Sequence, residues 1–111
     1  MQAPSVDAVF HALAHPARRA VVARLGRGPA TVSELAGPSG MALPSFTQHL
    51  QVLERSGVVR SHKRGRVRTY VLAPEPLSAA EAWLADQRAL WTKRLDQLDA
   101  LLLSDDPLES P

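Results

Sequence analysis

The sequence predicts a mainly α-helical domain with one small β-hairpin and a long C-terminal helix. Three observations predict this fold class. Several segments carry apolar residues at helical spacing. A helix-capping pattern is followed by a glycine-rich turn and a second helical segment, and two short β-branched segments flank one glycine. A chain of 111 residues suits a single domain, expected over residues 5–103, and 45% hydrophobic residues is typical of a folded protein.

The N-terminal segment predicts two short helices. Ser5 can cap a helix over about residues 6–14, in which apolar side chains recur four residues apart. Pro16 interrupts this pattern and suits the first turn of a second helix, because a first-turn residue needs no backbone N–H. We expect that second helix to run from Pro16 to about Arg27, where glycine and proline follow.

A helix-turn-helix outline follows over about residues 31–56. Thr31 and Glu34 form a capping-box pattern, with a hydroxyl at the cap and a carboxylate three residues later. A helix of about six to eight residues is expected there, and Gly37–Gly40 then forces a turn. A longer helix is expected from Leu43 or Pro44 to Arg55. Short helix, glycine-containing turn and second helix are the outline of a helix-turn-helix.

The second of these helices has the side chains that a DNA-reading helix needs. Phe46, Leu50 and Leu53 define its buried stripe, so Gln48 and Gln51 face away from the core. Short and amide side chains let a helix approach base edges, and glutamine can bind adenine through two hydrogen bonds. In isolation, a solvated polar face would give the same pattern. The predicted DNA-reading residues are Ser45, Thr47, Gln48, His49 and Gln51.

The next segment predicts a basic hairpin, called the wing below, over about residues 58–72. Its strands are expected at 58–62 and 67–72, with Arg64-Gly65-Arg66 between them. Residues 60–70 carry five Lys or Arg and no acid, which exceeds what is needed to protect an edge strand from aggregation. Such a hairpin fits a minor groove or flanking phosphates. The predicted contacts are His62, Lys63, Arg64, Arg66 and Arg68.

Charge is distributed unevenly along the chain. Residues 1–73 contain ten Lys or Arg against three acids, a net charge of +7, and residues 74–111 contain three against eight, a net charge of −5. This asymmetry favours a basic half that binds an anionic partner and an acidic half that stays clear of it.

The C-terminal segment predicts a long dimerisation helix over about residues 77–103, after a rigid break at residues 73–76. Its apolar side chains recur every seven residues, and a core this small could hardly cover so long a stripe. Self-association is therefore expected. The predicted dimerisation residues are Leu84, Trp91, Leu95, Leu98 and Leu102, and residues 104–111 are expected to be a disordered tail.

Four segments in this order resemble the ArsR family of winged helix-turn-helix regulators. They read FHALAHPARRAVVARL, TVSELA, LPSFTQHLQVLERSGVV and KRGRVRTYVL, and the resemblance extends over roughly residues 5–103. It implies a homodimer that binds palindromic operator DNA and represses transcription. It also implies that Ser45, Thr47, Gln48 and His49 meet DNA from the recognition helix and that Arg64, Arg66 and Arg68 do so from the wing. Phe46 departs from the smaller apolar residue usual at its position.

Metal, cofactor and catalytic sites are not expected. The chain has no cysteine, which excludes disulfides and thiolate ligands, and residues 33–36 lack the thiols of metal-sensing relatives. The last helix has aspartates but no histidine. His11 and His15 are four residues apart, but the helix is expected to end before Pro16 follows, so they are a poor zinc pair. No nucleophile, base and electrophile stabiliser converge in a recognisable spacing.

The expected partners are double-stranded operator DNA and a second copy of the chain, in the cytoplasm. No apolar run approaches the roughly 20 residues of a membrane span, and the N-terminus lacks a signal-peptide core. A small-molecule inducer is left open, because nothing marks a site for it. The alternative function is a winged-helix module that binds a partner protein through its last helix and touches DNA weakly. A salt titration of DNA binding separates the two.

Overall fold

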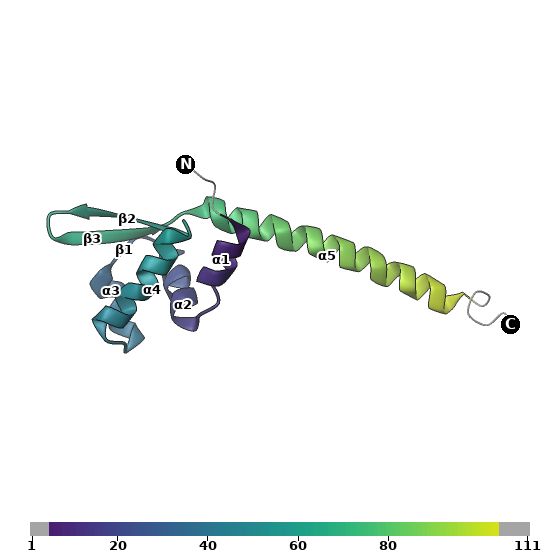
Figure 1. The fold of residues 1–111 in the computed structure, drawn as a ribbon, viewed down its shortest axis with the longest axis horizontal. Helices are drawn as coiled ribbons and strands as arrows, with labels where there is room; N and C mark the ends of the chain where they lie inside the picture. Colours follow the sequence, from purple (N-terminus) through teal and green to yellow (C-terminus); the bar gives the residue numbers. More distant parts are fainter. Residues whose placement is uncertain (1–4, 105–111) are drawn as a thin grey trace. The chain divides into compact units, whose positions relative to one another are not determined.

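The structure is a computed structural model and describes residues 5–104 (Figure 1). Its internal contacts divide the chain into two units, residues 1–80 and 81–111. The elements, in chain order, are α1 (Val6–Ala12), α2 (Pro16–Leu25), β1 (Ala30–Thr31), α3 (Val32–Ala36), a 3₁₀ turn η1 (Gly37–Ser39), α4 (Leu43–Arg55), β2 (Val59–Arg64), β3 (Val67–Leu72) and α5 (Pro74–Leu103). The mainly α-helical class with a β-hairpin and a long last helix is confirmed. The predicted tail lies, apart from Ser104, outside the described residues.

Side-chain caps start the first three helices, at the predicted Ser5 and Thr31 and also at His15. Ser5 Oγ accepts a hydrogen bond from the backbone three residues on, at 3.0 Å, and His15 Nδ1 accepts one at the start of α2, also at 3.0 Å. Thr31 and Glu34 form the reciprocal capping box, with distances of 3.2 and 2.8 Å. Each cap satisfies amides that a helix N-terminus leaves without partners.

Three helices end earlier than predicted. α1 ends at Ala12 instead of residue 14, because the bonding tightens to a three-residue spacing before Pro16, which has no N–H to continue it. α2 ends at Leu25 instead of Arg27, and the chain then passes through Gly28 at φ 140°, a conformation that favours glycine. α3 has five residues, because the chain tightens into η1.

The sheet has three antiparallel strands in the order β1-β3-β2, whereas the sequence predicted only the hairpin. β1 pairs Ala30 with Tyr70. β2 continues to Arg64, which pairs with Val67, so the hairpin turn consists of Gly65 and Arg66 alone. Gly65 has φ 64°, the left-handed region that glycine adopts without strain.

The predicted break at residues 73–76 is wrong. α5 begins at Pro74, and Pro74 and Pro76 both lie in its first turn. Proline is tolerated there because the first-turn amides have no carbonyl to bond within the helix.

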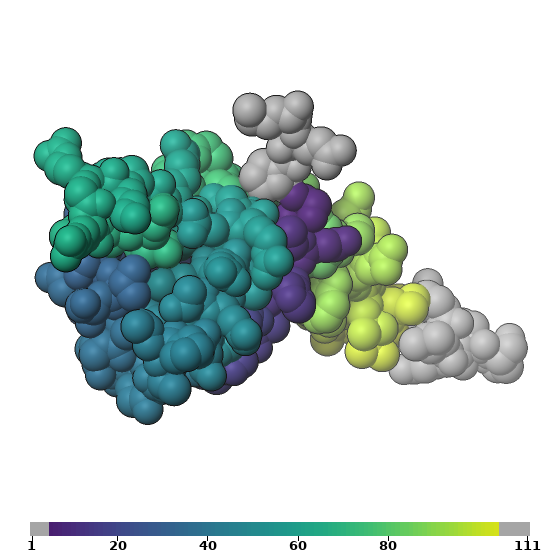
Figure 2. Space-filling model, turned by 60° about the vertical axis from the view of Figure 1, so that its left-hand side comes forward, coloured from purple at the N-terminus to yellow at the C-terminus, as the bar shows by residue number. Residues whose placement is uncertain are grey.

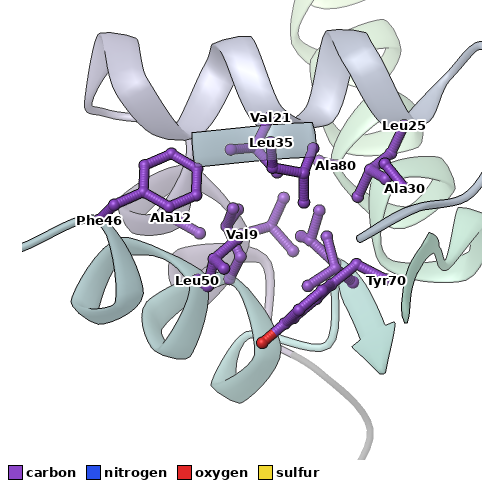
Figure 3. Packing of buried hydrophobic residues seen from close by; sticks show 13 residues of the cluster. Val9, Ala12, Val21, Leu25, Ala30, Leu35, Phe46, Leu50, Tyr70 and Ala80 are labelled. Carbon is purple, nitrogen blue, oxygen red and sulfur yellow. The ribbon is translucent and has the colours of Figure 1, made fainter. Parts of the chain in front are cut away.

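One core supports α4 and the base of the hairpin within the first unit (Figure 3). The predicted buried stripe of α4 is confirmed, since Phe46, Leu50 and Leu53 are at most 1% exposed. The buried cluster comprises Val9, Ala12, Val21, Leu25, Ala30, Leu35, Phe46, Leu50, Leu53, Val58, Val59, Tyr70 and Ala80. Because all four helices, the sheet and the start of α5 contribute to it, the outward face of α4 and the base of the wing are held by the same packing.

Candidate nucleic-acid interface

The outward face of α4 carries the predicted DNA-reading side chains. Ser45, Gln48 and Gln51 are exposed, and Thr47 is half-buried on the shoulder. The first turn of α4 contains no acid, and Ala42 at its N-cap provides no side-chain hydrogen bond. The free amides and the positive end of the helix dipole therefore suit an anionic group near the residues that would meet base edges.

His49 lies on the other flank of α4 and is half-buried. Its Nδ1 atom is 3.0 Å from Nη1 of Arg18 in α2, and its ring lies 4.3 Å from that of His15. Burial, followed by the neighbouring His15 and Arg18, lowers the pKa of His49. The sequence placed His49 among the residues that meet DNA, but it carried no signal for this contact with α2, which comes from 31 residues away.

The wing is a cationic surface. All five predicted wing residues are exposed. Lys63 and Arg68 face each other directly across the strands, an arrangement of like charges that destabilises a hairpin when no acid compensates it. One cation of the segment is neutralised: Arg60 forms an exposed ion pair with Glu75 at 2.8 Å. Within residues 5–104 no acid forms an ion pair with the other cations of the wing, which favours an external anionic partner.

A hydrogen-bonded chain links the wing to α4. Arg68 Nη1 donates to Ser61 Oγ at 2.8 Å, and Ser61 Oγ donates to Glu54 of α4 at 2.7 Å. Burial, and then the neighbouring Glu54, raise the pKa of the Tyr70 phenol beside this chain. No sequence pattern marks Glu54 or Ser61 as members of this chain. The only available signal was that Glu54 is one of three acids in residues 1–73.

The hydrogen bond from Ser61 to Glu54 shows which face of the hairpin is turned toward α4. Side chains alternate between the faces of a strand, so Lys63 shares the face of Ser61, and Arg68 opposite Lys63 shares it too. That face is the one on which Ser61 contacts Glu54 of α4. The surfaces of the helix-turn-helix and of the wing are both visible on one side of the first unit (Figure 2). One ligand could therefore contact α4 and the wing together.

The second unit, described for residues 81–104, presents an apolar surface on α5. All five predicted dimerisation residues are exposed, from 47% for Leu84 to 68% for Trp91. Leu90 and Leu101 add exposed apolar area on the neighbouring stripe of the same helix. An apolar surface of this length on a single helix indicates an interaction site.

Two other kinds of site are absent from residues 5–104. No three His, Asp or Glu side chains in this range come together as metal ligands would. No helix in this range combines the length and apolar composition needed to cross a membrane.

Comparison with known proteins identifies relatives along most of the chain. Residues 13–62 match a family model described as a helix-turn-helix domain. The transcriptional regulator Rv2034 of Mycobacterium tuberculosis is 38% identical over 91 residues, which cover 82% of each chain. The transcriptional repressor SdpR of Bacillus subtilis is 29% identical over 76 residues, or 68% of this chain and 84% of the repressor.

Solved structures show the same fold. The crystal structure of the ArsR family transcriptional regulator RHA00566 has 60% sequence identity and a TM-score of 0.75, covering 78% of this chain and 96% of that one. The homodimeric winged helix-turn-helix DNA-binding domain of Mb0332 from Mycobacterium bovis has 26% identity and a TM-score of 0.59, covering 83% of this chain and 82% of that domain.

Proposed function

Because the chain belongs to the ArsR family of winged helix-turn-helix transcriptional regulators, we propose that it is a homodimeric repressor of a palindromic operator. In this proposal α4 reads bases in the major groove, and the wing contacts the flanking backbone or minor groove. The family is one of regulators and not of enzymes, and we propose that the protein acts in the cytoplasm. Repression itself is supported by the likeness to the repressor SdpR.

One observation carries the proposal: an exposed amide-bearing helix face is tied to a cationic hairpin that has too few acids to neutralise it. Gln48 and Gln51 supply base-reading groups, and the wing supplies charge. The chain from Arg68 through Ser61 to Glu54 couples the two. A surface for binding a protein would not need two cations, Lys63 and Arg68, directly opposite each other across the strands.

The proposed dimer rests on the exposed stripe of α5 and on the homodimeric state of the Mb0332 domain. Two-fold symmetry would place two α4 helices about 34 Å apart, one turn of DNA, which makes a palindrome readable. The alternative is a winged-helix module that binds another protein through α5. It predicts a nearly flat dependence of DNA affinity on salt, whereas the repressor predicts a steep negative one.

Replacing Arg66 by alanine tests the role of the wing. We expect Arg66→Ala to weaken binding to every duplex several-fold and to reduce the slope of log affinity against log salt by about one, because one phosphate contact is lost. Fluorescence anisotropy across a salt series measures both. Arg60→Ala is the matched control, since Glu75 already neutralises Arg60. Equal salt slopes for wild type and Arg66→Ala would contradict the role assigned to the wing.

Replacing Gln48 by alanine tests base reading by α4. We expect Gln48→Ala to lose about 1–3 kcal/mol of discrimination between operator and scrambled duplex, the range for one bidentate base contact. Affinity for the scrambled duplex should stay unchanged. Gln97→Ala, which removes an exposed amide from α5, is the control and should bind both duplexes as the wild type does. If Gln48→Ala discriminates between operator and scrambled duplex as well as the wild type does, Gln48 does not read bases.

A cavity of about 740 Å³ lies between α2, α3, η1 and α4, a volume that suits a small molecule. Two cations, Arg24 and Arg27, line it together with Glu34, further polar side chains and apolar ones; the further polar side chains are His15 and Ser39. A compound that releases DNA from the complex would be identified as an inducer.

A further inference from the structure

One guanidinium joins the end of α1 to the recognition helix. Arg18, near the start of α2, donates from Nε to the carbonyl oxygen of Ala12 at 2.7 Å and from Nη2 to that of His11 at 3.2 Å. Both carbonyls belong to the last turn of α1, where the helix itself leaves carbonyls without partners, and that of His11 also accepts the N–H of Ala14 at 3.2 Å. The third contact of Arg18 is Nη1 to Nδ1 of His49 in α4, at 3.0 Å.

His49, the residue of α4 that Arg18 contacts, also packs against a second side chain, that of His15. The ring of His15 lies 4.3 Å from that of His49 at an interplanar angle of 41°. His15 is itself fixed, because its Nδ1 accepts the backbone N–H of Ala17. A guanidinium only donates, so the contact with Arg18 requires that His49 Nδ1 carry a lone pair and that the ring be neutral.

The hydrogen bond between Arg18 and His49 restricts the orientation of α4 more than apolar packing alone does. The apolar stripe of α4 determines which side of the helix is buried, and a hydrogen bond additionally restricts rotation about the helix axis. His49 adjoins Gln48 in the chain, so a rotation that broke its bond to Arg18 would also displace the reading amide. Base contacts through two hydrogen bonds tolerate displacements of only about 0.5 Å.

We propose that Arg18 is a positioning residue for operator reading, that it holds the recognition helix through neutral His49, and that protonation of His49 in mild acid releases this hold. The inference rests on the proposed function, because it requires a sequence that the protein prefers.

The electrostatic surroundings set the direction of the pH response. The groups that face His49 are Arg18 and His15, and no acid among residues 5–104 bonds to this cluster. Burial, then His15 and Arg18, lower the pKa of His49 from 6.5. The folded form thus favours neutral His49. The hydrogen bond between Arg18 and His49 is therefore fully formed above pH 6.5, and it is lost as the pH falls through the lowered pKa of His49. A His49 that instead contacted phosphate would strengthen DNA binding in acid.

The experiment compares two duplexes: one selected by the wild-type protein from a random-sequence library, and one unselected. Anisotropy at constant ionic strength gives the ratio of the two affinities from about pH 7.5 to about pH 5.5, the range in which histidine titrates. Taking the ratio removes any change in affinity that is common to both duplexes. We expect the wild-type ratio to fall about tenfold over this range.

Two variants test whether the pH dependence of this ratio arises from His49 and Arg18. His49→Asn keeps a side-chain acceptor and cannot titrate, so we expect it to hold its ratio nearly constant with pH. Arg18→Gln should lower the ratio about tenfold already at neutral pH. Arg19→Gln is the matched control, because Arg19 donates to the carbonyl oxygen of Leu13, also beside the end of α1, and forms no hydrogen bond with α4 within residues 5–104. Circular dichroism checks that each variant is folded.

The outcomes separate the two proposals. If selection enriches no sequence, the proposed function fails. If a sequence is enriched but the wild-type ratio is flat or rises in acid, the inference about His49 is overturned. It is also overturned if His49→Asn keeps the wild-type loss, because the titrating group is then another one. His49→Asn remains informative even if Arg18→Gln does not fold.

Discussion

Replacing Leu95 by aspartate is expected to convert the protein to a monomer and to lower its affinity for a palindromic operator by about a hundredfold or more. Leu95 is 58% exposed and lies on the apolar stripe of α5 that the proposed dimer buries. A buried carboxylate without a partner would oppose association. Once the two recognition helices are no longer joined, each half-site must be bound independently, and the gain from binding two linked sites disappears.

Analytical ultracentrifugation measures the loss of the dimer, and anisotropy with full and half operators measures the loss of affinity. We expect Leu95→Asp to bind the half operator about as well as the wild type does. Ala89→Asp is the matched control, because it introduces the same charge on an exposed side of α5 away from the stripe. If the Leu95→Asp protein stays dimeric, the dimer interface does not lie on this stripe of α5.

Replacing Phe46 by alanine is expected to lower the free energy of unfolding by about 3–5 kcal/mol, the range for truncating a buried aromatic side chain. Phe46 is 1% exposed and belongs to the core that supports α4 (Figure 3). This loss is a large share of the stability of a small domain. Because Phe46 belongs to α4, the proposed recognition helix, DNA binding should decline with stability.

Urea unfolding at a fixed protein concentration measures this effect, since association would contribute to the apparent stability. Leu43→Ala is the control on the same helix: Leu43 is 55% exposed, and its truncation should change the free energy of unfolding by at most about 0.5 kcal/mol. Equal losses for the two variants would show that the α4 stripe does not anchor the helix.

Features with short-range causes could be predicted from the sequence. The capping box of Thr31 and Glu34 depends on groups three residues apart, and both of its hydrogen bonds form as expected. The buried stripe of α4 follows from helical spacing alone. The break predicted at Pro74 failed for a local reason too, because proline ends a helix in its interior but is accepted in its first turn.

Features that depend on distant partners could not be predicted in this way. β1 has two residues, and its pairing with β3 joins positions about forty residues apart, so no periodicity marks it. The neutralisation of Arg60 depends on Glu75, which the sequence placed in a break. Exposure of the wing cations was predictable, but their linkage to α4 through Ser61 and Glu54 was not.

The sequence by itself determined the order of the helices and of the two hairpin strands, the buried face of α4, the cationic wing and the apolar stripe of α5. Each of these follows from spacing within one element, because the position of a residue along a helix or strand determines which face its side chain occupies. Only the tertiary structure decided which polar groups are already engaged: His49 by Arg18 and Arg68 by Ser61. Hydrogen bonds between elements depend on positions that the whole core sets together, so a residue predicted to face DNA can instead be held by a neighbouring helix.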